Sequence, residues 1–309
     1  MKTPKATSPQ ISVILTAFNA AKFIRVAIKS VLLQTFTDFE LIIVDDGSTD
    51  NSLSVIRRAV QLDHRCIVVS RGNKGIVESS NEALALSRGK YVFKMDADDS
   101  CHKERFALQF AYLEAHPRCV AVGTRVLLAD AEMLPIIEMF LRLSHSEIDA
   151  ENMRGHGSAI CNPSVAMRRD AVVAVGGYRK DFECAEDLDL FLRLAEIGEL
   201  ANLPEVLLTY RQHLRSVGHS RRALQIVRAH EAVKSAQKRR GSQAAALAHP
   251  ALSHDKAYDS LGDIHRKWVW QSLIGGHPAT ARKHALLALR KDPLHSGNLR
   301  LLACAIRGR

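Results

Sequence analysis

The hydrophobic pattern changes period repeatedly along the first part of the chain. The β-branched run Ile11–Ala17 is typical of a strand that is buried on both faces of a parallel sheet. Residues 21–34 then carry apolar side chains at helical spacing, and a second buried run, Leu41–Val44, follows directly. Because strands and helices alternate, we expect a doubly wound α/β fold that binds ligands at the carboxyl ends of its strands. The same alternation continues with helices at Ser52–Leu62 and Ile76–Ser87 and strands at Cys66–Ser70 and Lys90–Met95.

The pattern is less regular after about residue 115 and becomes purely helical near the C-terminal end. Strands are predicted at Cys119–Leu128 and Ser164–Met167, and a helix at Leu188–Glu196. From residue 221 onward the spacing is helical only, so we place a domain boundary at residue 218, between domains 1–218 and 219–309. Residues 279–305 read as helix, Asp-Pro and helix, which is similar to a single tetratricopeptide-type hairpin.

Charge is distributed unevenly along the 309 residues. The net charge is +10, but residues 221–309 contain 17 Lys and Arg against five Asp and Glu. This basic tail suits either an anionic membrane face or another acidic partner, or it is a solvated helical surface. Six cysteines without CxxC spacing indicate reduced thiols, and we find no signal peptide or apolar stretch long enough to span a bilayer. We therefore expect a cytoplasmic protein, either soluble or peripheral on the cytoplasmic face of the membrane.

Two acidic clusters follow predicted strands. Asp45 and Asp46 follow the run LIIV, and the sequence MDADD places Asp96, Asp98 and Asp99 after another strand. Carboxylates that lie close together raise each other's pKa unless a cation neutralises them. Since hard oxygen ligands suit Mg²⁺ or Mn²⁺, the cluster MDADD predicts a divalent metal site for a nucleoside diphosphate. The alternative is that these residues cap a following helix.

The segment VDDGSTD also has two readings. Gly47–Asp50 contains residues that favour turns and helix caps, so it could serve only to start the helix at Ser52. The two aspartates before the turn indicate a binding role, because carboxylates at the end of a strand are well placed to accept hydrogen bonds from a base or a ribose.

Five motifs in one order resemble a family 2 glycosyltransferase of the GT-A fold, a Rossmann-like, mostly parallel sheet with helices on both faces. The resemblance covers residues 11–215, about two thirds of the chain. It rests on SVILTAFNAAKF with VDDGSTDNS, NKG, SRGKYVFKMDADD, NPSVAMRRDAVVAVGGY, and AEDLDLFLRLAEIGELANLPEVLLTYRQH. It implies an inverting, metal-dependent transfer of a sugar from a nucleotide sugar.

The resemblance also implies roles for residues. Asp187 would be the catalytic base that accepts the proton of the acceptor hydroxyl, and Glu186 would support it or bind the acceptor. The alternative is an acidic cluster that stabilises a helix N-terminus. The metal, Mn²⁺ or Mg²⁺, would be held by Asp98, Asp96, Asp99 and His213, although His213 in TYRQH is also read as structural. The nucleotide would be held by Thr16, Ala17, Phe18, Asn19, Asp45, Asp46, Asn73, Gly75, Asp96 and Ala97.

Some positions leave the chemistry open. The family often has Arg where this chain has Ser80, which puts one diphosphate contact in doubt. The loop Gly155–Asn162 is interpreted as lining the acceptor site or as a plain connection. Trp268 and Trp270 suit packing between the C-terminal helices better than anchoring at a membrane.

The leading hypothesis is a hexosyltransferase-type enzyme that uses a UDP-sugar and acts in cell-envelope polysaccharide synthesis. Its partners would be the nucleotide sugar, a glycan or lipid-linked acceptor, and an anionic membrane that residues 219–309 contact. Nucleic acid is disfavoured because the tail lacks a stacking motif. The alternatives are an inactive GT-A scaffold that acts through the basic tail, and a sugar-phosphate nucleotidylyltransferase, which would carry a Gly-rich basic first loop.

Overall fold

The computed structural model describes residues 8–155, 158–213, 221–241 and 260–308. These residues fall into two compact units. The first contains 8–125, 141–155, 158–208 and 221–241, and the second contains 126–140, 209–213 and 260–308. The domain division at residue 218 stays a prediction.

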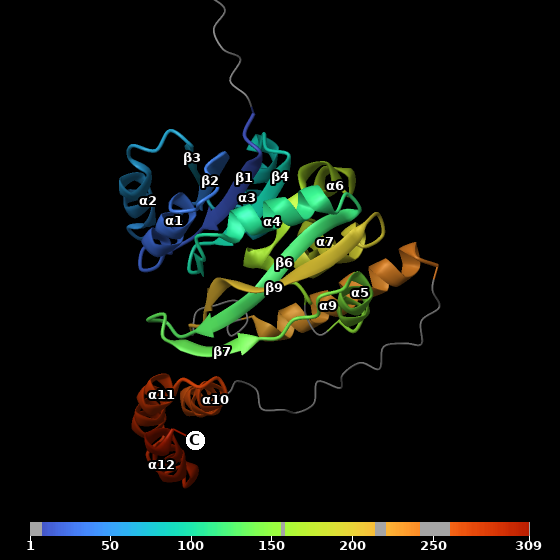
Figure 1. Cartoon of the computed structure of the whole chain (residues 1–309). Helices are drawn as coiled ribbons and strands as arrows, with labels where there is room; N and C mark the ends of the chain where they lie inside the picture. Colours follow the sequence, from blue (N-terminus) through green and yellow to red (C-terminus); the bar gives the residue numbers. More distant parts are fainter. Residues whose placement is uncertain (1–7, 156–157, 214–220, 242–259, 309) are drawn as a thin grey trace, which may run out of the picture. The chain divides into compact units, whose positions relative to one another are not determined.

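The strands of the described residues form a mixed sheet (Figure 1). Its order is β3-β2-β1-β4-β8-β6-β9-β5, with β7 paired to the end of β6. β3, β2, β1 and β4 run parallel, whereas β8 is antiparallel to both β4 and β6. The strands are β1 (Ile11–Ala17), β2 (Phe39–Asp46), β3 (Cys66–Arg71), β4 (Tyr91–Asp96), β5 (Ser100–Cys101), β6 (Cys119–Ala129), β7 (Pro135–Met139), β8 (Ala166–Arg168) and β9 (Glu199–Arg211).

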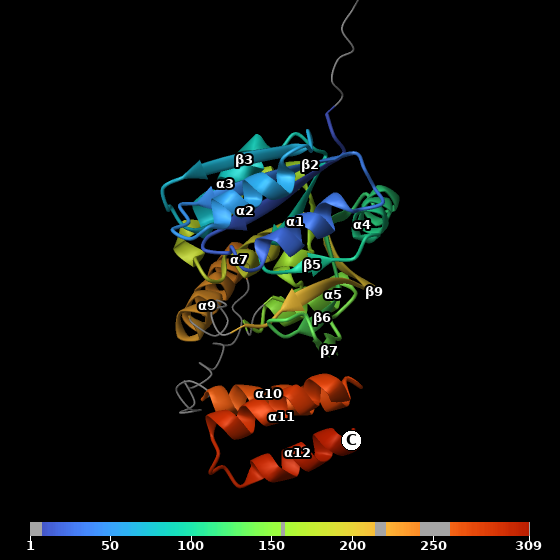
Figure 2. The same cartoon turned by 90° about the vertical axis from the view of Figure 1, so that its left-hand side faces the viewer.

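Helices cover both faces of the parallel half of the sheet (Figures 1 and 2). On one face, Ile14, Ile42 and Val92 pack against residues of α3, α6 and α7. On the other face, Phe106 of α4 meets the rings of Phe39 and Phe93 edge to face. The helices are α1 (Ile24–Leu32), α2 (Ser52–Val60), α3 (Ile76–Leu86), α4 (Arg105–Ala115), α5 (His145–Asn152), α6 (Arg169–Ala174), α7 (Glu186–Leu194), α9 (Arg222–Arg239), α10 (Leu261–Ile274), α11 (Pro278–Lys291) and α12 (Gly297–Arg307).

The alternation of strands and helices along the first hundred residues is confirmed. The expected strand Ile11–Ala17 is β1 without a shift at either end, and the helices and strands predicted up to Met95 lie within a few residues of those observed. These elements were predictable because a strand buried on both faces is apolar throughout. The capping interpretation of MDADD is wrong, because β5 intervenes and α4 begins only at Arg105.

The second unit combines the β6–β7 hairpin with three helices. Ile136 of β7 packs against Ile264 and Trp268 of α10, so Trp268 is a core residue as expected. Buried polar groups join the same elements, since Asp130 accepts backbone hydrogen bonds from Glu132 and Leu134 and pairs with Lys283 of α11. A further small core joins α10, α11 and α12 through Val269, Ala281, Ala285, Leu301 and Ala305. The two helices expected on either side of Asp292-Pro293 within residues 279–305 are α11 and α12, and α10 lies in the stretch that was predicted to be helical throughout.

Candidate active site at the carboxyl ends of the strands

The loops after β1 and β2 lock together at the carboxyl edge of the sheet. Asn19 has a left-handed backbone, and its side chain Oδ1 accepts hydrogen bonds from the backbone N–H groups of Thr49 (2.8 Å) and Asp50 (3.3 Å). Asp50 in turn accepts from the N–H of Ala21 (3.2 Å) and of Ser52 (2.9 Å). The turn GSTD therefore starts α2 and also fixes the loop after β1, which carries Phe18 and Asn19. The interpretation of Asp45 and Asp46 as acceptors for a base or a ribose stays a prediction.

Asp46 is a buried carboxylate whose hydrogen-bonding capacity is well used. It accepts the backbone N–H of Lys74 (2.8 Å) and of Gly75 (2.9 Å) and forms an ion pair with Arg71. Burial alone would raise the pKa of Asp46, but these N–H donors and the guanidinium hold it below its usual value. The Asn73 amide also donates to the backbone carbonyl of Asp46 (3.0 Å). Asp46, Asn73 and Gly75, predicted together as nucleotide residues, are thus one hydrogen-bonded group.

Gly47 allows the close approach of the backbone between Asp46 and Asn73. Its backbone φ of +72° is in the left-handed region, and an added Cβ would lie 2.5 Å from the backbone nitrogen of Asn73. A side chain here would therefore push the end of β2, which carries Asp46, away from the loop that carries Asn73.

Asp45 points into a different environment from its neighbour. It is 1% exposed, and its Oδ2 accepts a hydrogen bond from the Ser70 hydroxyl (2.9 Å). Its Oδ1 is buried and has no hydrogen-bond partner among the described residues. The pairing of β1 with β2 places Asp45 beside Ala17. Asp45 therefore belongs to the same edge, although its role in nucleotide binding stays a prediction.

The end of β4 carries the second acidic cluster together with a buried lysine. Thr16 pairs with Asp96 in the register of β1 and β4. Lys94 is 1% exposed, and its Nζ lies 2.7 Å from Asp96 Oδ1 and 3.4 Å from Thr16 Oγ1. Asp98 is partly exposed, whereas Asp99 is fully buried. Sequence reasoning missed Lys94, although a lysine inside an apolar strand is itself a signal that a partner of opposite charge lies nearby.

The first turn of α7 brings two more carboxylates to this cluster. Burial, and next the charge of Asp187, raise the pKa of Glu186 to about 7. Burial likewise raises the pKa of Asp187 to about 6, with the negative charge of Asp96 adding to the effect. The Oε2 atom of Glu186 is buried and has no hydrogen-bond partner among the described residues. The strand end and the helix start therefore form one electrostatic unit, in which protonation near neutral pH is set by burial and by like charges.

Buried neutral groups surround the same carboxylates. The Tyr178 side chain is 3% exposed, and its hydroxyl has no hydrogen-bond partner among the residues that the structure describes. Burial, and next the charges of Glu186 and Asp187, raise the pKa of Tyr178, so its hydroxyl stays protonated. Burial together with the charges of Asp99, Asp96 and Asp187 raises the pKa of the Cys161 thiol well above its usual value. Cys161 belongs to the loop Gly155–Asn162, so the end of this loop lies near the acidic residues.

Long-range hydrogen bonds hold α7 and Tyr178 in place. Asn81 of α3 accepts the backbone N–H of Tyr178 (2.9 Å) and donates to its carbonyl (2.8 Å). Asp189 is fully buried between Arg179 and Arg193, and Arg193 also donates to the carbonyl of Gly177 (2.7 Å). This network fixes the helix start relative to the Tyr178 loop. Asn81, which follows Ser80, therefore has a structural role in positioning Tyr178.

The acidic residues fit a divalent cation only together with a ligand. Among the residues described, no three His, Cys, Asp or Glu side chains are arranged to hold a metal by themselves. Mg²⁺ is commonly held by one or two carboxylates with phosphate and water completing its shell, and Asp96 and Asp98 supply hard oxygens of that kind. Burial and like charges raise the pKa values of Glu186 and Asp187, so a cation held nearby would favour their ionised forms. His213 follows β9 in the second unit, and its role as a metal ligand stays a prediction.

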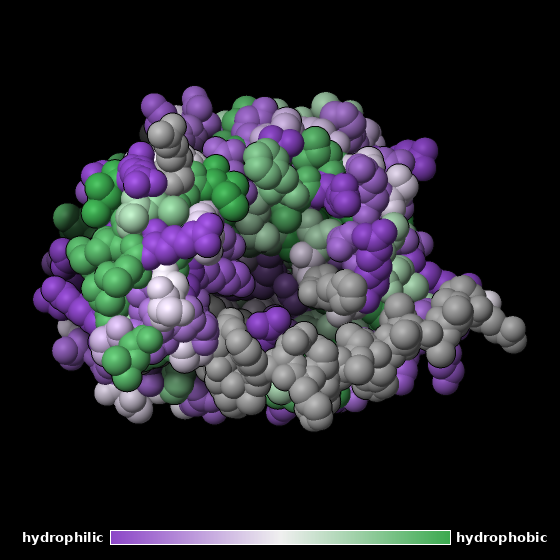
Figure 3. All heavy atoms as spheres, turned by 90° about the horizontal axis from the view of Figure 1, so that it is seen from below, coloured by the Kyte–Doolittle hydropathy of each residue, from purple (hydrophilic) through white to green (hydrophobic). Residues whose placement is uncertain are grey.

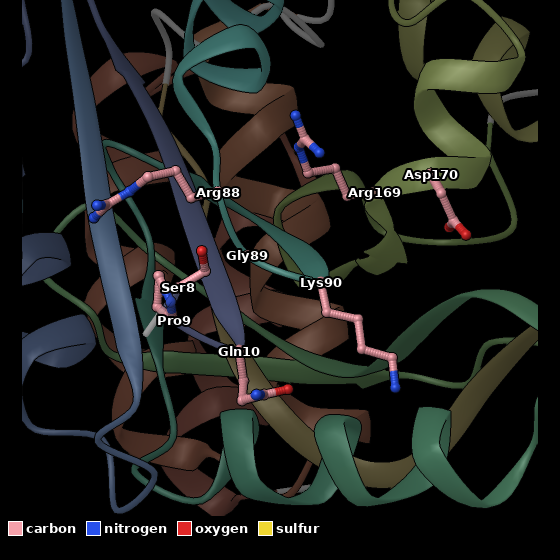
Figure 4. Close-up of a pocket in the computed structure, with 8 residues that line it drawn as sticks. All are labelled: Ser8, Pro9, Gln10, Arg88, Gly89, Lys90, Arg169 and Asp170. Atoms are coloured by element: carbon pink, nitrogen blue, oxygen red, sulfur yellow. The ribbon is translucent and has the colours of Figure 1, made fainter. Parts of the chain in front are cut away.

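A separate open cavity of about 390 Å³ lies at the other edge of the sheet, near the amino ends of β1 and β4. It is lined by Ser8, Pro9, Gln10, Arg88, Gly89, Lys90, Arg169 and Asp170. Figure 4 shows that the side chains of Arg88, Lys90 and Arg169 point in different directions, so they do not converge on one ligand. The predicted site residues all lie elsewhere, which favours the carboxyl edge as the site of chemistry.

A family model described as Glycosyl transferase family 2 matches residues 12–175. The chain belongs to glycosyl transferase family 2. The putative glycosyltransferase EpsE of Bacillus subtilis is 30% identical over 217 residues, which are 67% of this chain and 74% of that protein. Glycosyl transfer is therefore favoured over nucleotidyl transfer.

Solved structures confirm the GT-A fold of this family 2 member. S. aureus TarS in complex with UDP-GlcNAc is 17% identical, with a TM-score of 0.56 over 97% of this chain and 72% of the other. The mannosyltransferase PcManGT of Pyrobaculum calidifontis, in complex with GDP-Man and Mn²⁺, is 20% identical. Its TM-score is 0.58 over 98% of this chain and 81% of the other. At these identities the likeness concerns the fold, and the ligands belong to those proteins.

Proposed function

We propose that this protein transfers a sugar from a nucleoside diphosphate sugar, preferably a UDP-sugar, to a hydroxyl group of a glycan or lipid-linked acceptor. The observation that carries the proposal is the joining of two acidic segments, the end of β4 and the start of α7, at the carboxyl edge of the sheet. One segment suits a metal-bound diphosphate and the other suits a proton acceptor. Family membership and the nucleotide-sugar complexes of the two structural neighbours support the same reaction.

Asp187 is the proposed base. Its pKa of about 6 leaves it mostly ionised at pH 7 but far more basic than an exposed aspartate. It takes the proton of the acceptor hydroxyl while that oxygen forms a bond to the anomeric carbon. The bond from the anomeric carbon to the diphosphate breaks on the opposite face, and its electron pair leaves with the nucleoside diphosphate. The configuration at the anomeric carbon is therefore inverted.

The other residues prepare the two reactants. The group formed by Asp46, Asn73 and Gly75 gives a rigid wall for the nucleoside. Asp96 and Asp98 would hold Mg²⁺ or Mn²⁺, with Asp99 as a further candidate. When bound, the cation neutralises charge on the departing diphosphate. The unpartnered buried atoms Glu186 Oε2 and Tyr178 Oη suit the hydroxyl groups of an acceptor, because a buried polar atom without a partner lowers stability until one is supplied.

Nucleotide binding tests the donor half of this proposal. We would titrate UDP and GDP into the protein by calorimetry, with Mn²⁺ or with EDTA, and repeat both titrations on Asp98→Asn. The proposal predicts binding that depends on the metal, is tighter for UDP, and weakens sharply in the variant. Binding of neither nucleotide under any condition would contradict it and would favour the inactive scaffold that acts through its basic tail. Tighter binding of GDP would correct the choice of donor alone.

A further inference from the structure

The last helix of the second unit has apolar side chains on two faces. Leu301 and Ala305 of α12 are buried in the small core that α12 shares with α10 and α11. On the outer side, Leu299 and Ile306 are 70% and 64% exposed. Their seven-residue spacing, with Ala303 between them, places all three on one stripe of the helix. Single exposed apolar residues are ordinary, but a stripe of them on the outside of a helix indicates a surface that is covered in use.

Two arginines lie beside this stripe. Arg300 and Arg307 are exposed and share the same seven-residue spacing, so they fall on an adjacent strip of the helix. Within the described part of the chain, no ion pair joins either of them to a carboxylate. We define Leu299, Arg300, Ala303, Ile306 and Arg307 as the basic apolar face of α12.

The three helices α10, α11 and α12 leave part of their positive charge uncompensated. Residues 260–308 contain eight Lys and Arg but only two acidic residues, Asp263 and Asp292, and both of these are paired with Arg266. Lys283 is paired with Asp130 and Glu132 of the β6–β7 hairpin. The remaining cations therefore add to the field of Arg300 and Arg307, and any surface that covers this face must accept positive charge.

The chemistry of the face distinguishes between occupants. A second copy of the chain would bring its own excess of cations against these arginines, which opposes self-association. An anionic lipid surface offers apolar acyl chains for Leu299 and Ile306 and negative headgroups for the arginines beside them, which is how amphipathic helices bind at membrane interfaces. Figure 3 shows hydrophobic residues next to hydrophilic ones on the side of the molecule seen from below. No helix among the described residues is long and apolar enough to cross a bilayer, so this contact would be peripheral.

We propose that the basic apolar face of α12 docks the protein on an anionic membrane surface. The inference rests on the proposed function in one respect, because a transferase with a lipid-linked acceptor gains from being held at the membrane that contains its acceptor. The docking itself requires no catalysis and is testable without any sugar donor.

Vesicle flotation of the full chain tests this proposal. We would compare vesicles of phosphatidylcholine alone with vesicles that also contain phosphatidylglycerol, for the wild type and two double variants. Arg300→Gln with Arg307→Gln should weaken binding to the anionic vesicles by about 25-fold, or about fivefold for each cation removed. Leu299→Gln with Ile306→Gln should weaken it by about tenfold or more. The matched controls are Leu62→Gln and Arg58→Gln, which change exposed residues of the first unit and should bind like the wild type.

Each outcome decides a separate point. Equal recovery of the wild type with neutral and anionic vesicles, or flotation of both double variants at the wild-type level, would overturn the proposal. A dimer in light scattering that is lost on changing Leu299 and Ile306 would instead assign the face to a second copy. Metal-dependent UDP binding is measured on the same samples. Its retention in the double variants, together with lost flotation, supports docking independently of catalysis, while its absence in the wild type would count against the proposed function alone.

Discussion

Asp46 and the pair formed by Glu186 and Asp187 lie at the same edge of the sheet and behave in opposite ways. At the end of β2, Asp46 receives two backbone N–H groups and a guanidinium, and its pKa is lowered. At the start of α7, Glu186 and Asp187 are placed among other carboxylates with few donors, and their pKa values are raised to about 7 and about 6. All three are carboxylates, so the difference arises from burial and like charges at α7 and from the donors that the fold supplies to Asp46. A saturated carboxylate is a fixed binding wall, whereas an unsatisfied one can take up a proton.

The largest effect is expected when the proposed base is removed, which tests whether the α7 carboxylates act differently from Asp46. Asp187→Asn keeps the shape of the side chain but not its basicity, so we expect the rate of sugar transfer to fall by about 10²- to 10⁴-fold while UDP binding is unchanged. The measurement is product formation under donor saturation, beside calorimetry with UDP.

Asp170→Asn is the matched control, because Asp170 is also an acidic residue in the first turn of a helix but is exposed on α6. It should transfer sugar at the wild-type rate. Normal turnover by Asp187→Asn would show that the α7 pair is only a helix-start cluster.

Removing the cation beside Asp46 should destabilise this saturated carboxylate. Arg71→Met leaves a carboxylate with a 6% exposed side chain without its ion-pair partner. We expect a loss of about 2–3 kcal/mol in the free energy of unfolding, below the 3–5 kcal/mol typical of fully buried pairs because Arg71 is partly exposed. Urea unfolding measures this loss. The exposed Arg58→Met on α2 serves as the control, and equal stability of both variants would mean that backbone donors alone satisfy Asp46.

Glu186 and Asp187 should make the free energy of unfolding depend on pH in the sense opposite to Asp46, because their pKa values are raised and that of Asp46 is lowered. A raised pKa in the folded state means that Glu186 contributes stability below its ordinary pKa, and that this contribution is lost as pH rises through about 7. Glu186→Gln should therefore raise the free energy of unfolding by about 1–2 kcal/mol at pH 8 and leave it nearly unchanged at pH 4.5. The control is Glu78→Gln, which changes an exposed glutamate in the first turn of α3. A stability gain that is independent of pH would rule out the electrostatic origin.

The smallest effect concerns the tyrosine beside this pair. Tyr178→Phe removes a buried hydroxyl that lacks a hydrogen-bond partner, so the free energy of unfolding should stay constant or rise by less than about 1 kcal/mol. Tyr91→Phe removes a hydroxyl that donates to Glu114 (2.6 Å) and should destabilise the protein by about 1 kcal/mol. Thermal unfolding of the two variants compares them directly. A larger loss for Tyr178→Phe than for Tyr91→Phe would show that the hydroxyl is already bound.

The sequence predicted the parts of the molecule that depend on local pattern. β1 and the helices and strands up to β4 follow from apolar periodicity, and the acidic residues at the strand ends could be placed because parallel strands end at one edge. The partners of these residues could not be placed in the same way. Arg71 reaches Asp46 across 25 residues, and Asn81 holds Tyr178 across 97. No periodicity encodes such contacts.

Buried charged side chains were the part of the structure that the sequence predicted least well. Lys94 is almost fully buried inside β4, and Arg105 lies beneath the sheet where its Nη2 donates to the carbonyl of Lys94 (2.9 Å). Sequence patterns place lysine and arginine at the surface, because burying a charge is costly unless it is paired. The acidic run MDADD also does not mark the start of α4, because β5 lies between the two.

The most direct test of the contrast between Asp46 and the pair at the start of α7 is an NMR titration of aspartates labelled with ¹³C at the carboxyl carbon. Asp46→Asn and Asp187→Asn assign the two resonances by their disappearance. We predict that the Asp187 signal titrates with a midpoint near 6 and that the Asp46 signal titrates below the ordinary aspartate value of 3.8. Titration of both residues below pH 4 would contradict the account, because the α7 pair would then have no more affinity for a proton than the binding wall at β2.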